Sequence, residues 1–118
     1  MQLDNLRQFL LGLPPATARR QWGKNLVFKI GEFRMFAVCA VDGSTLSRVS
    51  FKVEPDEFDE LTRRTGVVPA PYLRRAKWVA LTDSLAMDAS ELRERLRESH
   101  GLNLAKLTQK ERAELGKA

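Results

Sequence analysis

Residues 67–79 carry the sequence VVPAPYLRRAKWV, and the rest of the chain is organised around this stretch. Pro69 and Pro71 each fix their own φ angle and push the preceding residue into an extended conformation. We therefore expect residues 68–71 to form a stiff extended crossing that is neither a helix nor a hydrogen-bonded strand. Residues 77–81 follow with the apolar character of a buried strand. The stretch is predicted to bridge the two halves of the domain and to provide a contact edge.

The composition fits a single globular domain over residues 1–118. Apolar residues make up 43% of the chain and charged residues 30%, and no tract is of low complexity. Cys39 is the only cysteine, so a disulfide framework is excluded and a reducing compartment is expected. No apolar stretch approaches the roughly 20 residues that span a membrane, and the N-terminus lacks the features of a signal peptide. The sequence predicts a cytoplasmic protein with no membrane partner.

The formal net charge of +5 is concentrated in the first half of the chain. Residues 1–53 contain eight lysines and arginines but three acids, whereas residues 54–118 contain twelve of each class. Such a basic excess favours an anionic partner such as nucleic acid, although basic surfaces also serve solubility alone.

Hydrophobic spacing and turn signals predict the order of helices and strands. Leucines at helical spacing over residues 3–13 predict an amphipathic helix that ends at Pro14. Apolar runs separated by turn residues then predict an antiparallel meander, a helix, the extended crossing, a fourth strand and two more helices. The strands are expected over residues 26–30, 33–41, 46–53 and 77–81, and the later helices over residues 54–65, 88–99 and 108–115. This order indicates an α+β fold with helices packed on one face of an antiparallel β-sheet.

Capping residues mark the ends of the last two helices. Either Asp88 or Ser90 is expected to cap the helix that begins there, and Gly101 is expected to end it. Thr108 and Glu111 have the spacing of a capping box for the short C-terminal helix.

The strand over residues 46–53 has the clearest alternation in the chain. Its apolar residues point to one face and its polar residues to the other, so one face is core and the opposite face is predicted to be solvated and basic. No acid alternates with these cations, although an exposed sheet face also needs polar residues for ordinary solvation. The cations expected on this face and on the loop beside it are Lys29, Arg34, Arg48, Lys52, Arg74, Arg75 and Lys77.

Candidate catalytic and metal-binding groups are few. His100, the only histidine, precedes Gly101 and is expected to face solvent or to end a helix rather than to act as a general base. Cys39 lies in an apolar run and is expected to pack in the core. The start of a helix explains the acids of residues 54–60, and no histidine or cysteine accompanies them. Because nucleotide-binding loops and nucleophile motifs are also missing, we expect no enzyme activity, no cofactor and no metal site.

A set of short motifs follows in order along the chain. Its members are Leu13-Pro14, Trp22-Gly23, Phe28-Lys29-Ile30, Phe36-Ala37, Ser50-Phe51-Lys52-Val53, VPAPYL at residues 68–73, Lys77-Trp78-Val79 and Glu98-Ser99. In this order and spacing they resemble the MmcQ/YjbR family of small bacterial proteins. The resemblance covers residues 13–99, with a weaker similarity over residues 107–115.

The resemblance implies a CyaY-like fold, an α+β arrangement related to that of frataxin, in agreement with the element order. Family members are described as carrying a double-wing DNA-binding motif in which β-hairpins act as wings, so the resemblance implies a DNA-binding protein. Two positions depart from the family pattern: His100 stands where an aromatic residue is usual, and Lys24-Asn25 stands where His-Pro is frequent. Iron binding is not carried over from frataxin, because Asp4 is the only acid in the predicted first helix.

Two functional hypotheses from different classes follow. The first is a DNA-binding protein of low sequence specificity that contacts phosphates through the seven cations named above. The second is a protein-interaction module, without nucleic-acid or catalytic activity, that uses the region of Tyr72 and Trp78. An enzyme acting on an anionic small molecule ranks third. Pro69, Pro71, Tyr72 and Trp78 are interpreted as fold determinants, and a monomer is favoured although the sequence leaves the oligomeric state open.

Overall fold

The computed structural model describes residues 3–21, 23–43 and 45–116. The predictions for Trp22 and Ser44 therefore fall outside the described residues. The helices are α1 (Leu3–Leu11), α2 (Pro55–Thr62), α3 (Ala89–Leu104) and α4 (Gln109–Gly116), with short 3₁₀ helices η1 (Arg74–Ala76) and η2 (Ser84–Ala86). The strands are β1 (Ala16–Gln21), β2 (Asn25–Ile30), β3 (Arg34–Asp42), β4 (Thr45–Lys52), β5 (Val67–Pro69) and β6 (Trp78–Leu81).

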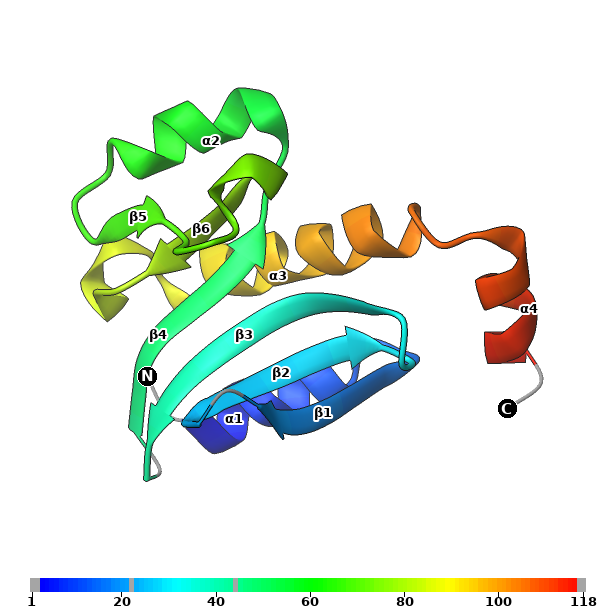
Figure 1. Cartoon of the computed structure of the whole chain (residues 1–118). Helices are drawn as coiled ribbons and strands as arrows, with labels where there is room; N and C mark the ends of the chain where they lie inside the picture. The colour runs from blue at the N-terminus through cyan, green and yellow to red at the C-terminus, as the bar shows by residue number, and fades with distance from the viewer. Residues whose placement is uncertain (1–2, 22, 44, 117–118) are drawn as a thin grey trace.

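The six strands form one open antiparallel sheet in the order β1-β2-β3-β4-β6-β5. Figure 1 shows α1 and α3 on the same side of this sheet, with α2 beside its β6-β5 end. The main hydrophobic cluster lies between these helices and the sheet, and it includes Leu10 of α1, Phe51 of β4 and Leu96 of α3. The α+β fold with helices on one face of an antiparallel sheet is therefore confirmed.

Two strands differ from the sequence predictions. β1 was not expected, because its sequence, ATARRQ, lacks the apolar alternation of a half-buried strand. β1 lies at the edge of the sheet, where it pairs with β2. An edge strand has one side open to solvent, so its residues can be polar. The expectation that residues 68–71 avoid strand pairing is wrong for Val68 and Pro69, which pair with β6 as part of β5. This is consistent with proline chemistry, because β5 is the other edge strand, where a missing N–H is tolerated.

Helix α3 is longer than predicted. Asp88 is its N-cap, with Oδ1 accepting from Glu91 N at 2.7 Å, but the helix continues through Gly101 to Leu104. The position of His100 was therefore wrong: it lies half-buried within α3, with Nε2 3.1 Å from Pro14 O and its ring edge-on to Phe36. The capping box of α4 is confirmed, because Thr108 N donates to Glu111 Oε1 at 2.9 Å and Glu111 N to Thr108 Oγ1 at 3.1 Å.

Ser99 of α3 joins two strands where they separate. The pairing of β3 with β4 stops at Ala37 and Phe51, one step before Phe36 and Lys52 would pair. There the fully buried Ser99 hydroxyl accepts from Lys52 N at 2.9 Å and donates to Phe36 O at 2.7 Å. A side chain of the helix thus replaces the missing rung of the sheet and fixes α3 against it.

The face of the sheet opposite α1 and α3, called the outer face below, has a small hydrophobic cluster of its own. Ala70, Trp78 and Ala80 form its buried part, and Met35, Val38 and Leu73 pack against them. Residues 70–77, the β5–β6 loop, contribute to this cluster and therefore lie over part of the outer face. The outer face is only partly covered, and the loop forms one wall of the surface described next.

Candidate functional site

Strand register determines which side chains share the outer face. Directly paired residues of an antiparallel sheet point to the same face, and successive residues alternate. Ser50 pairs with Val38 on one side and Ala80 on the other, and Arg48 pairs with Ala40. Lys29, beyond a bulge in β2, pairs with Met35 of the outer-face cluster. The predicted outward positions of Lys29, Arg48 and Lys52 are therefore confirmed.

Four of the predicted cations are available to a ligand. Arg74 and Arg75 are exposed, and Lys29 and Arg48 are half-buried. Within the part of the chain that the structure describes, no hydrogen bond or ion pair is formed by these four side chains. The only acid in the described strands is Asp42, at the end of β3, with Oδ1 3.6 Å from Lys24 Nζ. The outer face therefore carries positive charge that the sheet itself does not neutralise.

Lys52 differs from the prediction of a solvated cation. It points to the outer face, but it is only 9% exposed, and its Nζ donates to Ala76 O of the β5–β6 loop. Burial, together with the nearby charges of Lys106 and Arg34, lowers the pKa of Lys52. The side chain holds the loop against β4, which makes Lys52 a structural residue rather than a solvated phosphate contact.

Arg34 and Lys77 also have partners within the fold. Arg34 is opposite the inward-facing Ile30, and its Nε donates to Asn103 Oδ1 of α3 at 3.4 Å. Lys77 precedes the outward-facing Trp78, and its Nζ lies 5.0 Å from the ring centroid of Phe58 in α2. The structure therefore does not gather these two cations with Lys29 and Arg48.

A pocket of about 540 Å³ lies between the outer face and the β5–β6 loop. Its volume is within the range of roughly 300–1,000 Å³ that is common for ligand pockets. The lining, called the outer pocket below, is mostly apolar with a few polar groups: Asn25, Met35, Val38, Arg48, Ser50, Ala70, Pro71, Tyr72 and Leu73. The strands supply its floor, and the loop supplies the opposite wall.

Tyr72 stands at the rim of the outer pocket with its side chain fully exposed. Its φ angle is 66°, in the left-handed region that bulky residues rarely occupy. The interpretation of Tyr72 as a fold determinant is therefore wrong as far as its ring is concerned, because the fully exposed ring belongs to neither hydrophobic cluster. Trp78, by contrast, is 3% exposed and packs beneath the loop, as a fold determinant should.

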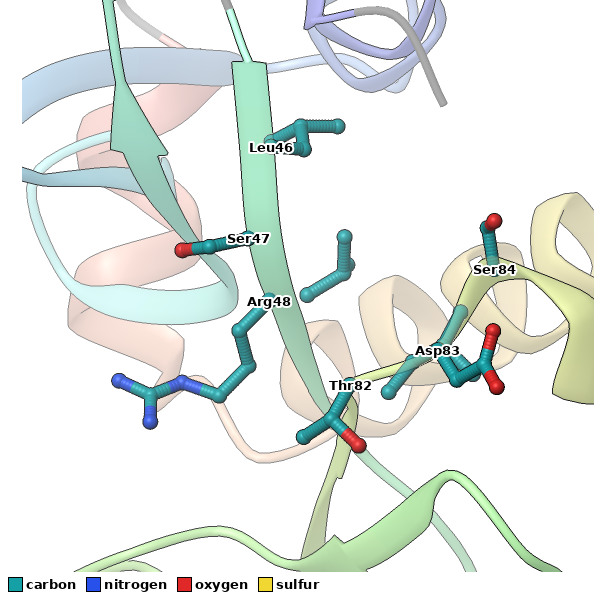
Figure 2. A pocket seen from close by; sticks show the side chains of 8 residues that line it. Leu46, Ser47, Arg48, Thr82, Asp83 and Ser84 are labelled. Atoms are coloured by element: carbon teal, nitrogen blue, oxygen red, sulfur yellow. The ribbon is translucent and has the colours of Figure 1, made fainter.

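Arg48 also borders a second, smaller pocket of about 230 Å³ at the end of β6. Leu81 is the last residue of β6 to pair with β4, so this pocket opens beside the part of β4 that β6 does not cover. Figure 2 shows the Arg48 guanidinium and the Asp83 carboxylate pointing away from each other. Asp83 Oδ1 instead accepts from Leu85 N at 2.9 Å, so Asp83 does not neutralise Arg48.

The groups with catalytic or metal-binding chemistry lie elsewhere. Cys39 is buried in β3, and burial raises the pKa of its thiol to about 12, so the thiolate is strongly disfavoured. His100 is engaged with Pro14 O and Phe36. Within residues 3–21, 23–43 and 45–116, histidine, cysteine and acidic side chains do not cluster in threes as a metal site would require. No helix of this same part of the chain is both long and apolar enough to cross a membrane.

Comparison with known proteins identifies the family of the chain. The model of the YjbR family matches residues 11–102, most of the chain. The chain belongs to the YjbR family. It is similar to the crystal structure of the Deinococcus radiodurans protein DR2400, described as a DUF419 domain, with 34% identity and a TM-score of 0.83 over 98% of this chain and 89% of that one.

A second similar structure, of a protein from Pseudomonas syringae, has 16% identity and a TM-score of 0.70 over 87% of this chain and 99% of that one, which shows a shared fold. The search of curated proteins found no match.

The sequence predictions for this YjbR-family chain gave Ser50 only as an outward-facing residue and Tyr72 only as part of a protein-contact region, and they placed neither residue in a pocket. Alternation places Ser50 on the outer face between Arg48 and Lys52. A small hydroxyl between two long cations was therefore the signal in the sequence that pointed to Ser50. Tyr72 combines a left-handed backbone with full exposure, and no local sequence pattern indicates either feature. The signal that was present for Tyr72 was its position between two prolines and two arginines in a loop.

Proposed function

We propose that this YjbR-family protein binds DNA with low sequence specificity and without catalysis, through the outer face and the β5–β6 loop. The observation that carries the proposal is the set of unneutralised cations: Lys29, Arg48, Arg74 and Arg75. Cations of this kind bind phosphates and release the counterions condensed on DNA. DNA as the ligand would also place the protein in the cytoplasm, as the lone cysteine led us to expect.

The arrangement of the sheet supports backbone contacts rather than reading of bases by a helix. Helices α1 and α3 lie behind the sheet (Figure 1), so the surface that carries the cations is made of strands and a loop. The β1–β2 and β3–β4 hairpins have their turns at the same end, because Val41 N donates to Lys24 O at 3.0 Å. Two hairpins ending side by side are compatible with the wings that the family resemblance implies. Phosphate contacts position a protein but carry no sequence information.

The test is a titration of fluorescently labelled duplex DNA, followed by anisotropy at two salt concentrations. Arg48→Gln should weaken binding severalfold and reduce the slope of log affinity against log salt by about 0.9, the value for one lost phosphate contact. Arg93→Gln is the matched control, because Arg93 is an exposed arginine of α3, on the side away from the outer face. If wild type binds no DNA even at low salt, or if the two variants behave alike, the proposal is wrong.

A protein-interaction module is the second candidate, and the exposed Tyr72 beside an apolar pocket is the observation that favours it. Trp78 is withdrawn from this hypothesis, because it is buried and offers no contact surface. Association through Tyr72 and the apolar lining would survive moderate salt, whereas phosphate binding would not. In the DNA titration, a protein-interaction module would show no binding at either salt concentration, which distinguishes the two candidates.

A further inference from the structure

The Ser50 hydroxyl lies in the outer pocket without a protein partner. Ser50 is 6% exposed, and its cross-strand neighbours, Val38 and Ala80, are apolar. No hydrogen bond to its side chain is formed within the described part of the chain. Ser50 Oγ is not among the described side-chain atoms that are closed off from solvent without a hydrogen-bond partner, so the hydroxyl opens into the pocket. The hydroxyl therefore marks a place where a ligand atom, as donor or acceptor, would be bound.

Tyr72 provides a flat apolar surface beside this hydroxyl. Tyr72 has a left-handed φ angle of 66°, and its fully exposed ring stands at the rim of the outer pocket. Backbone in such a conformation is costly for a bulky residue, and such positions concentrate at functional sites. Exposed aromatic rings on basic surfaces bind single-stranded nucleic acids by stacking on the bases. The ring and the apolar floor of Met35 and Val38 therefore suit a planar, largely apolar group.

Arg48 supplies the charge at the same site. It lines both the outer pocket and the smaller pocket at the end of β6, and no acid neutralises it within the described residues. Arg74 and Arg75 follow Tyr72 in the loop and are exposed. A planar group bound in the outer pocket would thus have Arg48 beside it and two further cations a few residues along the loop from Tyr72, which suits a base joined to phosphates.

We propose that the outer pocket binds one unpaired nucleotide of DNA, an inference that rests on the proposed DNA-binding function. The base stacks on Tyr72 above Met35 and Val38, its edge forms a hydrogen bond with Ser50, and Arg48 binds the adjoining phosphate. A paired base cannot enter, because its edge is occupied and it is stacked within the duplex. The protein therefore prefers single-stranded or unpaired DNA. A hydroxyl both donates and accepts, so the pocket selects little among the four bases.

Charge favours this occupant over an apolar peptide. An apolar segment would fill the floor of the outer pocket but would leave Arg48 partly desolvated and unpaired, which is costly. A nucleotide provides a planar apolar base, hydrogen-bonding edges and a phosphate in one unit. It matches all three kinds of group that the pocket presents.

The experiment measures the affinity of the full chain for a short single strand and for the duplex made from it. The strand contains 2-aminopurine, whose fluorescence falls when it stacks on an aromatic ring. Wild type should bind the single strand more tightly than the duplex and quench the probe. Tyr72→Ala should lose about fivefold or more in single-strand affinity, the lower end for one stacked base, with the quenching abolished and duplex binding unchanged. Tyr72→Phe should retain both the affinity and the quenching.

The control is Leu85→Ala, which removes another large exposed apolar side chain, in η2, and should change nothing. Equal binding of single strand and duplex, with Tyr72→Ala like wild type and Arg48→Gln weaker, would overturn the nucleotide pocket but leave the proposed DNA binding intact. Absence of binding to either form would overturn both proposals. Because Tyr72 is fully exposed, its replacement does not threaten folding.

Discussion

Replacing Ser99 with alanine tests how α3 is joined to the sheet. The substitution removes a hydroxyl that satisfies two buried backbone groups, Lys52 N at 2.9 Å and Phe36 O at 2.7 Å. An unsatisfied buried polar group costs about 1–3 kcal/mol, so we expect Ser99→Ala to lower the free energy of unfolding by about 2–4 kcal/mol. With a urea m value of about 1–2 kcal/mol/M, the midpoint should fall by roughly 1–4 M.

The assay is urea unfolding followed by circular dichroism, with Ser50→Ala as the matched control. Ser50 is also a buried serine of the sheet region, but its side chain has no protein partner within the described residues. We therefore expect its replacement to change the midpoint little. If the two alanine variants unfold at the same midpoint, the role assigned to Ser99 is wrong.

Three further predictions concern other parts of the fold. Burial and the neighbouring Glu57 raise the pKa of Glu98 above its ordinary value of 4.5. The protonated carboxyl therefore contributes stability below pH 4.5, and this contribution is lost as the pH rises through the raised pKa of the folded state. Glu98→Gln should therefore raise the urea midpoint at neutral pH and give no gain in acid; a gain that grows in acid would contradict this. Gly31→Ala should lower the melting temperature more than Gly43→Ala. Both glycines have positive φ angles, a conformation that costs alanine about 1–2 kcal/mol. At Gly31 the added Cβ would also lie 2.5 Å from Leu115 Cδ2, whereas at Gly43 it would meet nothing within 4 Å. Cys39 should react with a thiol reagent only as fast as the protein opens, since it is buried and its pKa is raised to about 12; rapid labelling of the native state would refute its burial.

The fold could be predicted where the sequence pattern and the burial of the residues agree. The alternation over residues 46–53 placed Phe51 in the core and Arg48 on the outer face, and both positions are confirmed. The capping box of Thr108 and Glu111 is local, so it depends on no distant contact. Such features are determined by neighbours within a few residues, and the sequence displays them directly.

Features that depend on distant partners could not be predicted in the same way. β1 is a strand because β2 pairs with it, while its own residues are too polar to indicate one. α3 continues past Gly101 because residues beyond it contact the sheet: Asn103 accepts from Arg34 Nε at 3.4 Å and donates to Ser99 O at 2.8 Å. A glycine is only a weak stop signal when the next turn has tertiary contacts.

The candidate site shows the same division. Lys29 and Arg48 could be placed on one face by alternation alone. The burial of Lys52 could not, because it results from the β5–β6 loop folding over β4, where Ala76 O accepts from its Nζ. The full exposure of the Tyr72 ring likewise could not be predicted, because it depends on how the β5–β6 loop folds. Tertiary contacts thus engage Lys52, Arg34 and Lys77 within the fold and leave the ring of Tyr72 exposed.

Chemical-shift mapping with a short single-stranded DNA tests the central claim most directly, namely that the outer face is the ligand surface. The account predicts shifts for the backbone amides of Val38, Ser50, Tyr72 and Ala80, which line the outer pocket or adjoin Ser50 in the sheet. Amides of α3 around Arg93, behind the sheet, should stay unchanged. Shifts confined to α3 or α4, with the outer pocket unaffected, would contradict the account.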